Sequence, residues 1–344
     1  MKETVEFLTK MPKFELHVHI EGAVKPNIYF KIAQKNNIDV GLKNIEEWQK
    51  FFQFKNFAHF IDVYIKAVSV LKKPEDYTEL IEGFFAYQAS QNILYSEAFL
   101  SASFLVESFS NSEILDAIEK GLKQGREKYK IEVALIPDIA RNIPQSKEAV
   151  LELVREGKER GLFIGIGLGG LENGHPARLF EDIYKKASEY GLRKVAHAGE
   201  AVGAESIAEA LDYLQAERIG HGIRCLDDSK LVERLKTTKT PLEVCPSSNY
   251  RLKLVEDNQV HPLRKMHDLG ILCTVNSDDP VMFSTSLTDE YLLLFNQGFS
   301  LEELWQLNLN AIEASFLSTK QKGNLVMEFE KWKKNFLLNY KKES

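Results

Sequence analysis

Four apolar segments, widely separated along the chain, each end in side chains that bind metals or transfer protons. The side chains concerned are His17 and His19, His197 and Glu200, His221, and Asp278 and Asp279. Short apolar runs are typical of buried strands, so these polar groups should stand at the carboxyl ends of strands. Parallel α/β architectures build their sites at that end. The four endings therefore favour parallel strands arranged around one shared site.

Strand-like and helix-like segments alternate along the whole chain. Eight runs have the composition of strands, at residues 14–19, 93–101, 132–140, 163–168, 194–198, 218–222, 241–245 and 271–276. Between them, apolar residues recur at helical spacing, as at Val150, Leu153 and Val154. This alternation predicts an α/β fold, a parallel (β/α)8 TIM barrel in a single domain over residues 1–344.

A doubly wound open sheet is the structural alternative. Such a sheet would carry a phosphate-binding GxGxxG motif after its first strand, and this chain has none there. The glycines gather at the fourth strand instead, at positions 165, 167, 169 and 170. A glycine run of this kind more often marks close backbone approach than phosphate binding, so we expect the barrel.

An aromatic segment follows the first strand, within a helical insertion over about residues 40–91. Its rings are Trp48, Phe51, Phe52, Phe54, Phe57, Phe60 and Tyr64. Helical spacing of apolar residues usually indicates ordinary core. An insertion after the first barrel strand also lies at the catalytic face, where it can act as a lid. We expect a helical lid here, and further helices over about residues 288–344.

Composition narrows the classes of function. The 344 residues, 44% of them hydrophobic, are enough for one large core. A net charge of −6 without a basic stripe argues against a nucleic-acid partner, and no apolar run reaches the ~18 residues of a membrane span. Cys225, Cys245 and Cys273 lack CxxC spacing, which is typical of reduced, packed thiols. We expect a soluble, cytoplasmic protein.

The strand-end residues have the chemistry of a zinc site. Three imidazoles and one carboxylate form a set suited to Zn²⁺, although Fe, Mn or Co could use the same ligands: His17, His19, His197 and Asp278. A metal lowers the pKa of its bound water. The reaction then needs a group that takes or orients the water proton, which suits His221, and an acid for a leaving amine, which suits Glu200.

Each of these residues also has an ordinary structural interpretation. A single histidine at a strand end is more often hydrogen-bonded in the core than a ligand. Asp279 precedes Pro280, a pair that is common in turns. The coincidence of four strand endings still favours a site, with Asp278 as ligand and Asp279 as substrate contact. The other histidines lack this context, and we expect them to be structural or peripheral: His59, His175, His261 and His267.

Taken in order, the motifs His-x-His, His-Ala-Gly-Glu, Gly-His-Gly and Ser-Asp-Asp-Pro resemble the adenosine deaminase family of metal-dependent hydrolases. The similarity covers residues 11–316. It implies an amidohydrolase-type barrel that binds one zinc ion per chain through the four ligands named above. The implied reaction is attack on C6 of a 6-aminopurine nucleoside with loss of ammonia, in which Glu200 protonates N1 and His221 activates the metal-bound water.

The resemblance also implies the substrate contacts. Asp279 matches the carboxylate that contacts purine N7, and Gly170 matches the backbone amide near N3. His19 and Glu21 complete the expected contacts. Glu21 stands where adenosine deaminases typically have an Asp that reaches the ribose.

The fourth strand departs from the family pattern. Residues 165–172 read Gly-Ile-Gly-Leu-Gly-Gly-Leu-Glu, where adenosine deaminases usually have Asp-Leu-Ala-Gly-Asp-Glu and adenine deaminases have Asp-Ser-Ser-Glu. With residues 57–61, 245–249 and 276–283, this run is most similar to the aminodeoxyfutalosine deaminases of menaquinone biosynthesis. Their substrate carries a carboxyphenyl ketone in place of the 5′-hydroxyl. The arginines that could meet its carboxylate are Arg141, Arg178 and Arg224.

The resemblance therefore implies adenosine or 6-amino-6-deoxyfutalosine as the substrate, and three other functions stay open. Free adenine is the alternative substrate of the same reaction. A two-metal amidohydrolase that opens a cyclic amide would need a carboxylated lysine at the end of the fourth strand, where this chain has Gly169 and Gly170. A silent barrel that only binds a nucleoside or a protein would not need both Glu200 and His221.

Overall fold

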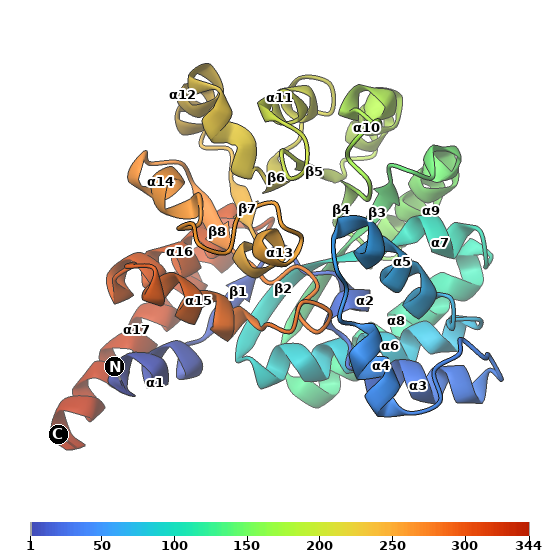
Figure 1. The fold of residues 1–344 in the computed structure, drawn as a ribbon, viewed down its shortest axis with the longest axis horizontal. Coiled ribbons are helices and arrows are strands. Elements are labelled where there is room, and N and C mark those ends of the chain that lie inside the picture. The colour runs from blue at the N-terminus through green and yellow to red at the C-terminus, as the bar shows by residue number, and fades with distance from the viewer. Residues whose placement is uncertain (1, 344) are drawn as a thin grey trace.

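Eight parallel strands form a nearly closed barrel in the computed structural model, which describes residues 2–343 (Figure 1). They follow the sequence order around the barrel, as β1 (Lys13–Glu15), β2 (Ile93–Ser101), β3 (Glu132–Ala140), β4 (Gly165–Gly169), β5 (Arg193–Ala198), β6 (Arg218–His221), β7 (Leu242–Val244) and β8 (Cys273–Val275). The ring is completed after β8, because the His19 N–H donates to the Asp278 carbonyl at 2.8 Å. The predicted (β/α)8 barrel is confirmed.

The first strand is shorter than the sequence predicts. β1 ends at Glu15, and the following residues join their neighbours through single bridges, from Val18 to Asp278 and from His19 to Phe99. This segment leaves the regular ladder where the chain must place both histidines in the barrel mouth. It turns at once into the short helix α2 (Ile20–Ala23).

Helices surround the barrel (Figure 1), and their buried apolar residues share one core with the strands. In α8, a capping box between Ser110 and Glu113 starts the helix, and Lys130 in the left-handed conformation ends it. The helices of this layer include α6 (Pro74–Ser90), α7 (Ala102–Val106), α8 (Asn111–Tyr129), α9 (Lys147–Glu159), α10 (Glu181–Glu189), α11 (Ala204–Asp212), α12 (Ser229–Thr238), α13 (Pro246–Arg251) and α14 (Leu263–Asp268). Short 3-10 turns lie at Pro144–Ser146, Ala177–Phe180 and Ile223–Asp227.

The insertion after β1 is helical, and its aromatic rings have two different surroundings. After α2 it forms α3 (Pro26–Lys35), α4 (Ile45–Phe51) and α5 (Phe57–Val68). Trp48 is buried and stacks on Tyr29 with centroids 5.9 Å apart, so it belongs to the core. Phe60 and Tyr64 of α5 line the cavity at the barrel mouth instead. A lid movement of α5 stays a prediction.

The two ends of the chain pack together beside the barrel (Figure 1). Three helices follow β8 where the sequence predicts helices, namely α15 (Leu287–Asn296), α16 (Leu301–Ala314) and α17 (Thr319–Glu343). Phe7 of α1 (Lys2–Lys10) contacts Trp305 and Trp332, with ring centroids 5.8 and 5.5 Å away. None of the helices described here combines the length and apolar character needed to cross a membrane. All three cysteines are buried and unpaired.

Candidate active site and metal centre

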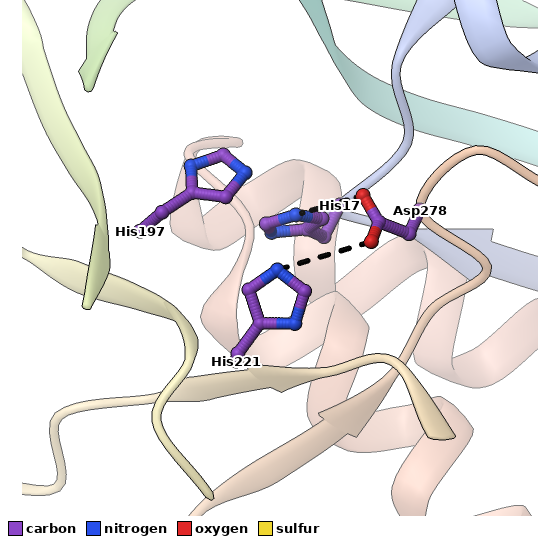
Figure 2. Close-up of side chains that lie close together, drawn as sticks. All are labelled: His17, His197, His221 and Asp278. Carbon is purple, nitrogen blue, oxygen red and sulfur yellow. Dashed lines mark ion pairs between the residues drawn. The ribbon is translucent and has the colours of Figure 1, made fainter. Parts of the chain in front are cut away.

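The four predicted metal ligands meet at the carboxyl-terminal mouth of the barrel, where Figure 2 shows three of them facing one another. His17 Nε2 and His19 Nε2 lie 3.5 and 3.4 Å from Asp278 Oδ1. His19 Nε2 also lies 3.2 Å from His197 Nε2. Tetrahedral zinc with bonds of about 2.0–2.1 Å has ligand atoms about 3.3 Å apart, so these spacings fit. His17 Nε2 is buried without a hydrogen-bond partner, as a nitrogen reserved for a metal would be.

His221 lies beside this set at a longer distance. Its Nε2 is 3.9 Å from Asp278 Oδ2 and 3.7 Å from Glu200 Oε1 (Figure 2 marks the first contact). Ligand atoms of His221, His17, His197 and Asp278 all lie within 4.8 Å of one another. The longer spacing places His221 at the edge of the metal set, where it can contact a water molecule that the metal binds.

Buried partners turn the ligand rings toward the centre. His17 Nδ1 lies 2.9 Å from Glu243 Oε2, and Glu243 in turn pairs with the buried Arg218. His197 Nδ1 lies 3.0 Å from the Leu168 carbonyl. Because each Nδ1 is engaged, each Nε2 faces the metal position. Partners of this kind fix the tautomer and the orientation of metal-binding histidines.

Two site residues have backbone angles that side chains other than glycine rarely adopt. His221 has φ of 60° and Asp278 has φ of 62°. Such conformations cost about 1–3 kcal/mol and persist where the surrounding structure enforces them. At Asp278 the backbone is held on both sides, because its N–H donates to the His17 carbonyl at 3.1 Å and its carbonyl accepts from His19.

Burial sets the protonation of the acid–base groups. Burial, followed by the charges of Asp278 and Glu172, raises the pKa of Glu200 well above its ordinary value. Burial and the Asp278 charge likewise raise the pKa of Asp279. Burial lowers the pKa of His221 to about 3. At neutral pH, Glu200 and Asp279 can therefore donate protons, while His221 is neutral.

A cavity of about 700 Å³, including its open mouth, lies over the ligand set. Its floor includes the predicted residues His19, Gly170, Glu200 and Asp279. Its upper wall is apolar and comes largely from α5, with Phe57, Phe60, Ile61, Tyr64 and Ile65. The barrel thus brings a polar reaction centre and an apolar binding wall together.

Glu21 does not line this cavity. Its side chain is buried, and its Oε1 accepts a hydrogen bond from the Ser101 N–H at 3.0 Å. A substrate contact from Glu21 stays a prediction. Arg141, Arg178 and Arg224 are also outside the cavity lining; Arg141 donates to the His175 carbonyl at 2.7 Å.

Sequence reasoning missed Asp138, which stands in the cavity wall at the end of β3. The carboxyl group is buried, and burial followed by the Glu21 charge raises its pKa well above the ordinary value. A Cβ at Gly169 would lie 2.7 Å from Asp138 Oδ2, so glycine there leaves room for this carboxyl group. The glycine run of the fourth strand therefore marks close approach. The available signal was an acid at the end of an apolar strand.

Sequence reasoning also missed Glu172, which holds the loop that carries Glu200. Its Oε1 accepts from the Gly199 N–H at 2.7 Å. Its Oε2 accepts from the N–H groups of Glu200, Ala201 and Val202 at 3.2, 2.8 and 2.9 Å. One buried carboxylate thus satisfies four consecutive backbone donors and fixes the start of the loop after β5.

Comparison with known proteins identifies the family. The model of the family described as "Adenosine deaminase" matches residues 12–332. The adenine deaminase of Trichlorobacter lovleyi is 35% identical over 95% of this chain and 94% of its own length. The chain belongs to the adenosine deaminase family. Another adenine deaminase of this family, from Wolinella succinogenes, is 37% identical over 94% of this chain and 98% of its own length.

Solved structures in the adenosine deaminase family share the whole fold. The crystal structure of adenine deaminase from Arthrobacter aurescens matches with a TM-score of 0.88 and 34% identity, covering 94% of this chain and 99% of that one. A Burkholderia ambifaria amidohydrolase with bound Zn matches with a TM-score of 0.89 and 25% identity, over 98% of this chain and 96% of that one. These named relatives are adenine deaminases or a zinc amidohydrolase. The family resemblance is thus confirmed, whereas the particular resemblance to aminodeoxyfutalosine deaminases is not supported.

Proposed function

We propose that this protein deaminates free adenine at C6 in a zinc-dependent reaction, releasing ammonia. The observation that carries the proposal is the whole-length similarity, at about 35% identity, to adenine deaminases in sequence and in solved structure. The site agrees with it, because Glu21, which stands at the position of the ribose-contacting Asp of adenosine deaminases, is outside the cavity lining and accepts a hydrogen bond from the Ser101 N–H. The absence of Asp-Ser-Ser-Glu at residues 167–172 means that the base would be held differently from the pattern of those relatives.

The site residues supply the steps around the purine. Zinc, held by His17, His19, His197 and Asp278, would supply an activated water at neutral pH. Glu200 carries a proton and donates it to N1, which makes C6 more electrophilic. Asp279 donates to N7, and the Gly170 N–H meets N3. The water oxygen bonds to C6 as its proton passes to the Glu200 carboxylate, and Glu200 returns this proton to N6. The C6–N6 bond then breaks, ammonia leaves, and the proton of the new C6 hydroxyl returns to Glu200.

A nucleoside with a large 5′ substituent is the second candidate, and the cavity favours it. The upper wall of the cavity is aromatic, with Phe57, Phe60 and Tyr64. This wall would suit the apolar tail of 6-amino-6-deoxyfutalosine.

The substrate is decided by direct comparison. Zinc-loaded protein is mixed in parallel with adenine, adenosine and 6-amino-6-deoxyfutalosine, and the loss of the 6-aminopurine absorbance is followed. We expect the highest kcat/KM for adenine. A higher kcat/KM for either nucleoside would mean that this nucleoside, and not free adenine, is the substrate. The wall formed by α5 would then determine specificity. No turnover of any of the three would overturn purine deamination itself.

A further inference from the structure

A chain of hydrogen bonds behind His221 determines which nitrogen of its ring carries the proton. It runs from the Leu263 backbone N–H through His261 and Asn249 to His221. The three side chains are at most 1% exposed. They come from separate parts of the fold, since His221 ends β6, Asn249 lies in α13 and His261 precedes α14. His261, which the sequence suggests is structural or peripheral, is therefore connected to the site.

The first link fixes the state of His261. The Leu263 N–H donates to His261 Nδ1 at 3.1 Å. A backbone N–H can only donate, so Nδ1 is unprotonated and the ring proton is on Nε2. His261 Nε2 lies 3.0 Å from Asn249 Oδ1, which accepts that proton in a hydrogen bond. The Leu263 N–H, which can only donate, therefore sets the donor-to-acceptor direction of this chain of hydrogen bonds.

The second link carries this direction through the Asn249 amide. With Oδ1 facing His261, Nδ2 faces His221 Nδ1 at 3.3 Å. An amide nitrogen only donates, so His221 Nδ1 must accept and carries no proton. The opposite amide orientation would set two donors, the Asn249 nitrogen and His261 Nε2–H, against each other. Both ends of the chain therefore require the same arrangement.

We infer that Asn249 and His261 are positioning residues that hold His221 as the tautomer protonated at Nε2. This Nε2–H lies 3.7 Å from Glu200 Oε1 and 3.9 Å from Asp278 Oδ2. Both distances are too long for direct hydrogen bonds, and a water oxygen that lies to one side of these atoms can hydrogen-bond to both. The Nε2–H therefore points to the place of the attacking water.

The consequence for the reaction rests on the proposed deamination. His221 donates a hydrogen bond to the water oxygen and keeps its own proton throughout. Its lone pair at Nδ1 is already engaged by Asn249, so His221 is not the base. When the water O–H bond breaks, the proton passes to Glu200, which becomes a carboxylate by protonating N1. The sequence leaves two roles open for His221, which are to take the water proton or to orient the water. This geometry assigns the second role.

The tautomer can be observed directly. Zinc-loaded protein labelled with ¹⁵N-histidine is studied by long-range ¹H–¹⁵N correlation NMR, and the His221 signals are assigned by their loss in His221→Gln. We expect a protonated Nε2 and an unprotonated Nδ1. A protonated Nδ1 with an unprotonated Nε2 would overturn the inference. This readout does not depend on turnover, so its outcome is separate from that of the proposed function.

Variants test whether this chain of hydrogen bonds determines the His221 tautomer. His261→Gln keeps a donor toward Asn249 and should preserve the His221 tautomer and a kcat within a few-fold of wild type. His261→Leu removes that donor and should lower kcat by about 10-fold or more, with zinc content and KM unchanged, since general acid–base contributions are about 10²–10⁴-fold. His267→Gln, at a partly buried histidine of α14 that lies beside Glu303, is the control and should change neither the His221 tautomer nor kcat. An unaltered His221 spectrum and kcat in His261→Leu would contradict the role of the chain.

Discussion

At the residue scale, the site depends on residues whose protonation or backbone conformation would be unfavourable in an exposed, unfolded chain. Burial, followed by the charges of Asp278 and Glu172, raises the pKa of Glu200 and so favours its protonated form. His221 and Asp278 keep left-handed backbone angles because neighbouring segments hold them. Glu172 has no contact with the ligand set in this structure, yet its carboxylate binds four backbone N–H groups of the loop that presents Glu200. The position of the acid therefore depends on a residue outside the reaction centre.

Replacing Glu172 should disturb catalysis through Glu200. In Glu172→Gln, an amide group faces N–H donors that need an acceptor, at a cost of about 1–3 kcal/mol. We expect kcat for the best substrate to fall about 10–100-fold with zinc content unchanged. Ammonia release and metal analysis measure the two quantities. Glu205→Gln, an exposed acid on the adjacent helix α11, is the matched control and should be neutral.

A double-mutant cycle separates this role from a general loss of structure. If Glu172 acts by placing Glu200, Glu172→Gln combined with Glu200→Gln should be no slower than Glu200→Gln alone. Additive losses in the double variant, or loss of zinc in Glu172→Gln, would mean that Glu172 supports the barrel rather than the acid.

At the element scale, β1 combines a functional end and a stabilising end. Its carboxyl end leads to His17 and His19 in the metal set. Its amino end holds Lys13, whose buried Nζ donates to the carbonyls of Thr9, Met11 and Gln91 at 3.2, 3.2 and 3.1 Å. In barrels of this type, residues at the amino-terminal face contribute to stability. Lys13 joins the first strand to the chain segments on both sides.

Lys13 should make stability depend on pH. Burial lowers its pKa from 10.5 to about 7 in the folded protein. Between these values the unfolded chain binds more protons, so the Lys13 contribution to the free energy of unfolding rises as pH increases from about 7 to about 10.5. Urea unfolding at several pH values should show this slope reduced in Lys13→Met. The exposed Lys25→Met is the control, and an equal slope in wild type and Lys13→Met would contradict the assignment.

The sequence predicted the elements better than their mutual contacts. Apolar strands that end in polar residues are local patterns, so the eight strands and the polar residues that meet at the barrel mouth could be predicted. Asp138 also carried such a local signal, whereas Glu172 and His261 act through contacts between segments far apart in the chain, which no local pattern contains. Whether Trp48 or Phe60 faces the cavity also depends on helix placement, because both have the same helical spacing. The preference among 6-aminopurines rested on short motifs at the fourth strand, whereas the whole-length similarity favours adenine, which the sequence left open as the alternative.

At the scale of the whole molecule, the barrel gathers ligands from near both ends of the chain into one site. His17 follows the first strand and Asp278 follows the last, and their backbones bond to each other where the ring closes. The metal site is thus built across the closure of the barrel. Because binding of a metal to the folded state alone adds to its stability, zinc should tie catalysis and folding together.

The central claim is that one metal ion, held by three histidines and Asp278, makes this barrel a purine deaminase. Metal-free protein is titrated with zinc while ammonia release from the best of the three purines is recorded. The rate should rise linearly to one zinc ion per chain and then stay constant. Full activity before zinc is added, or a rate that continues to rise to two ions per chain, would contradict the account.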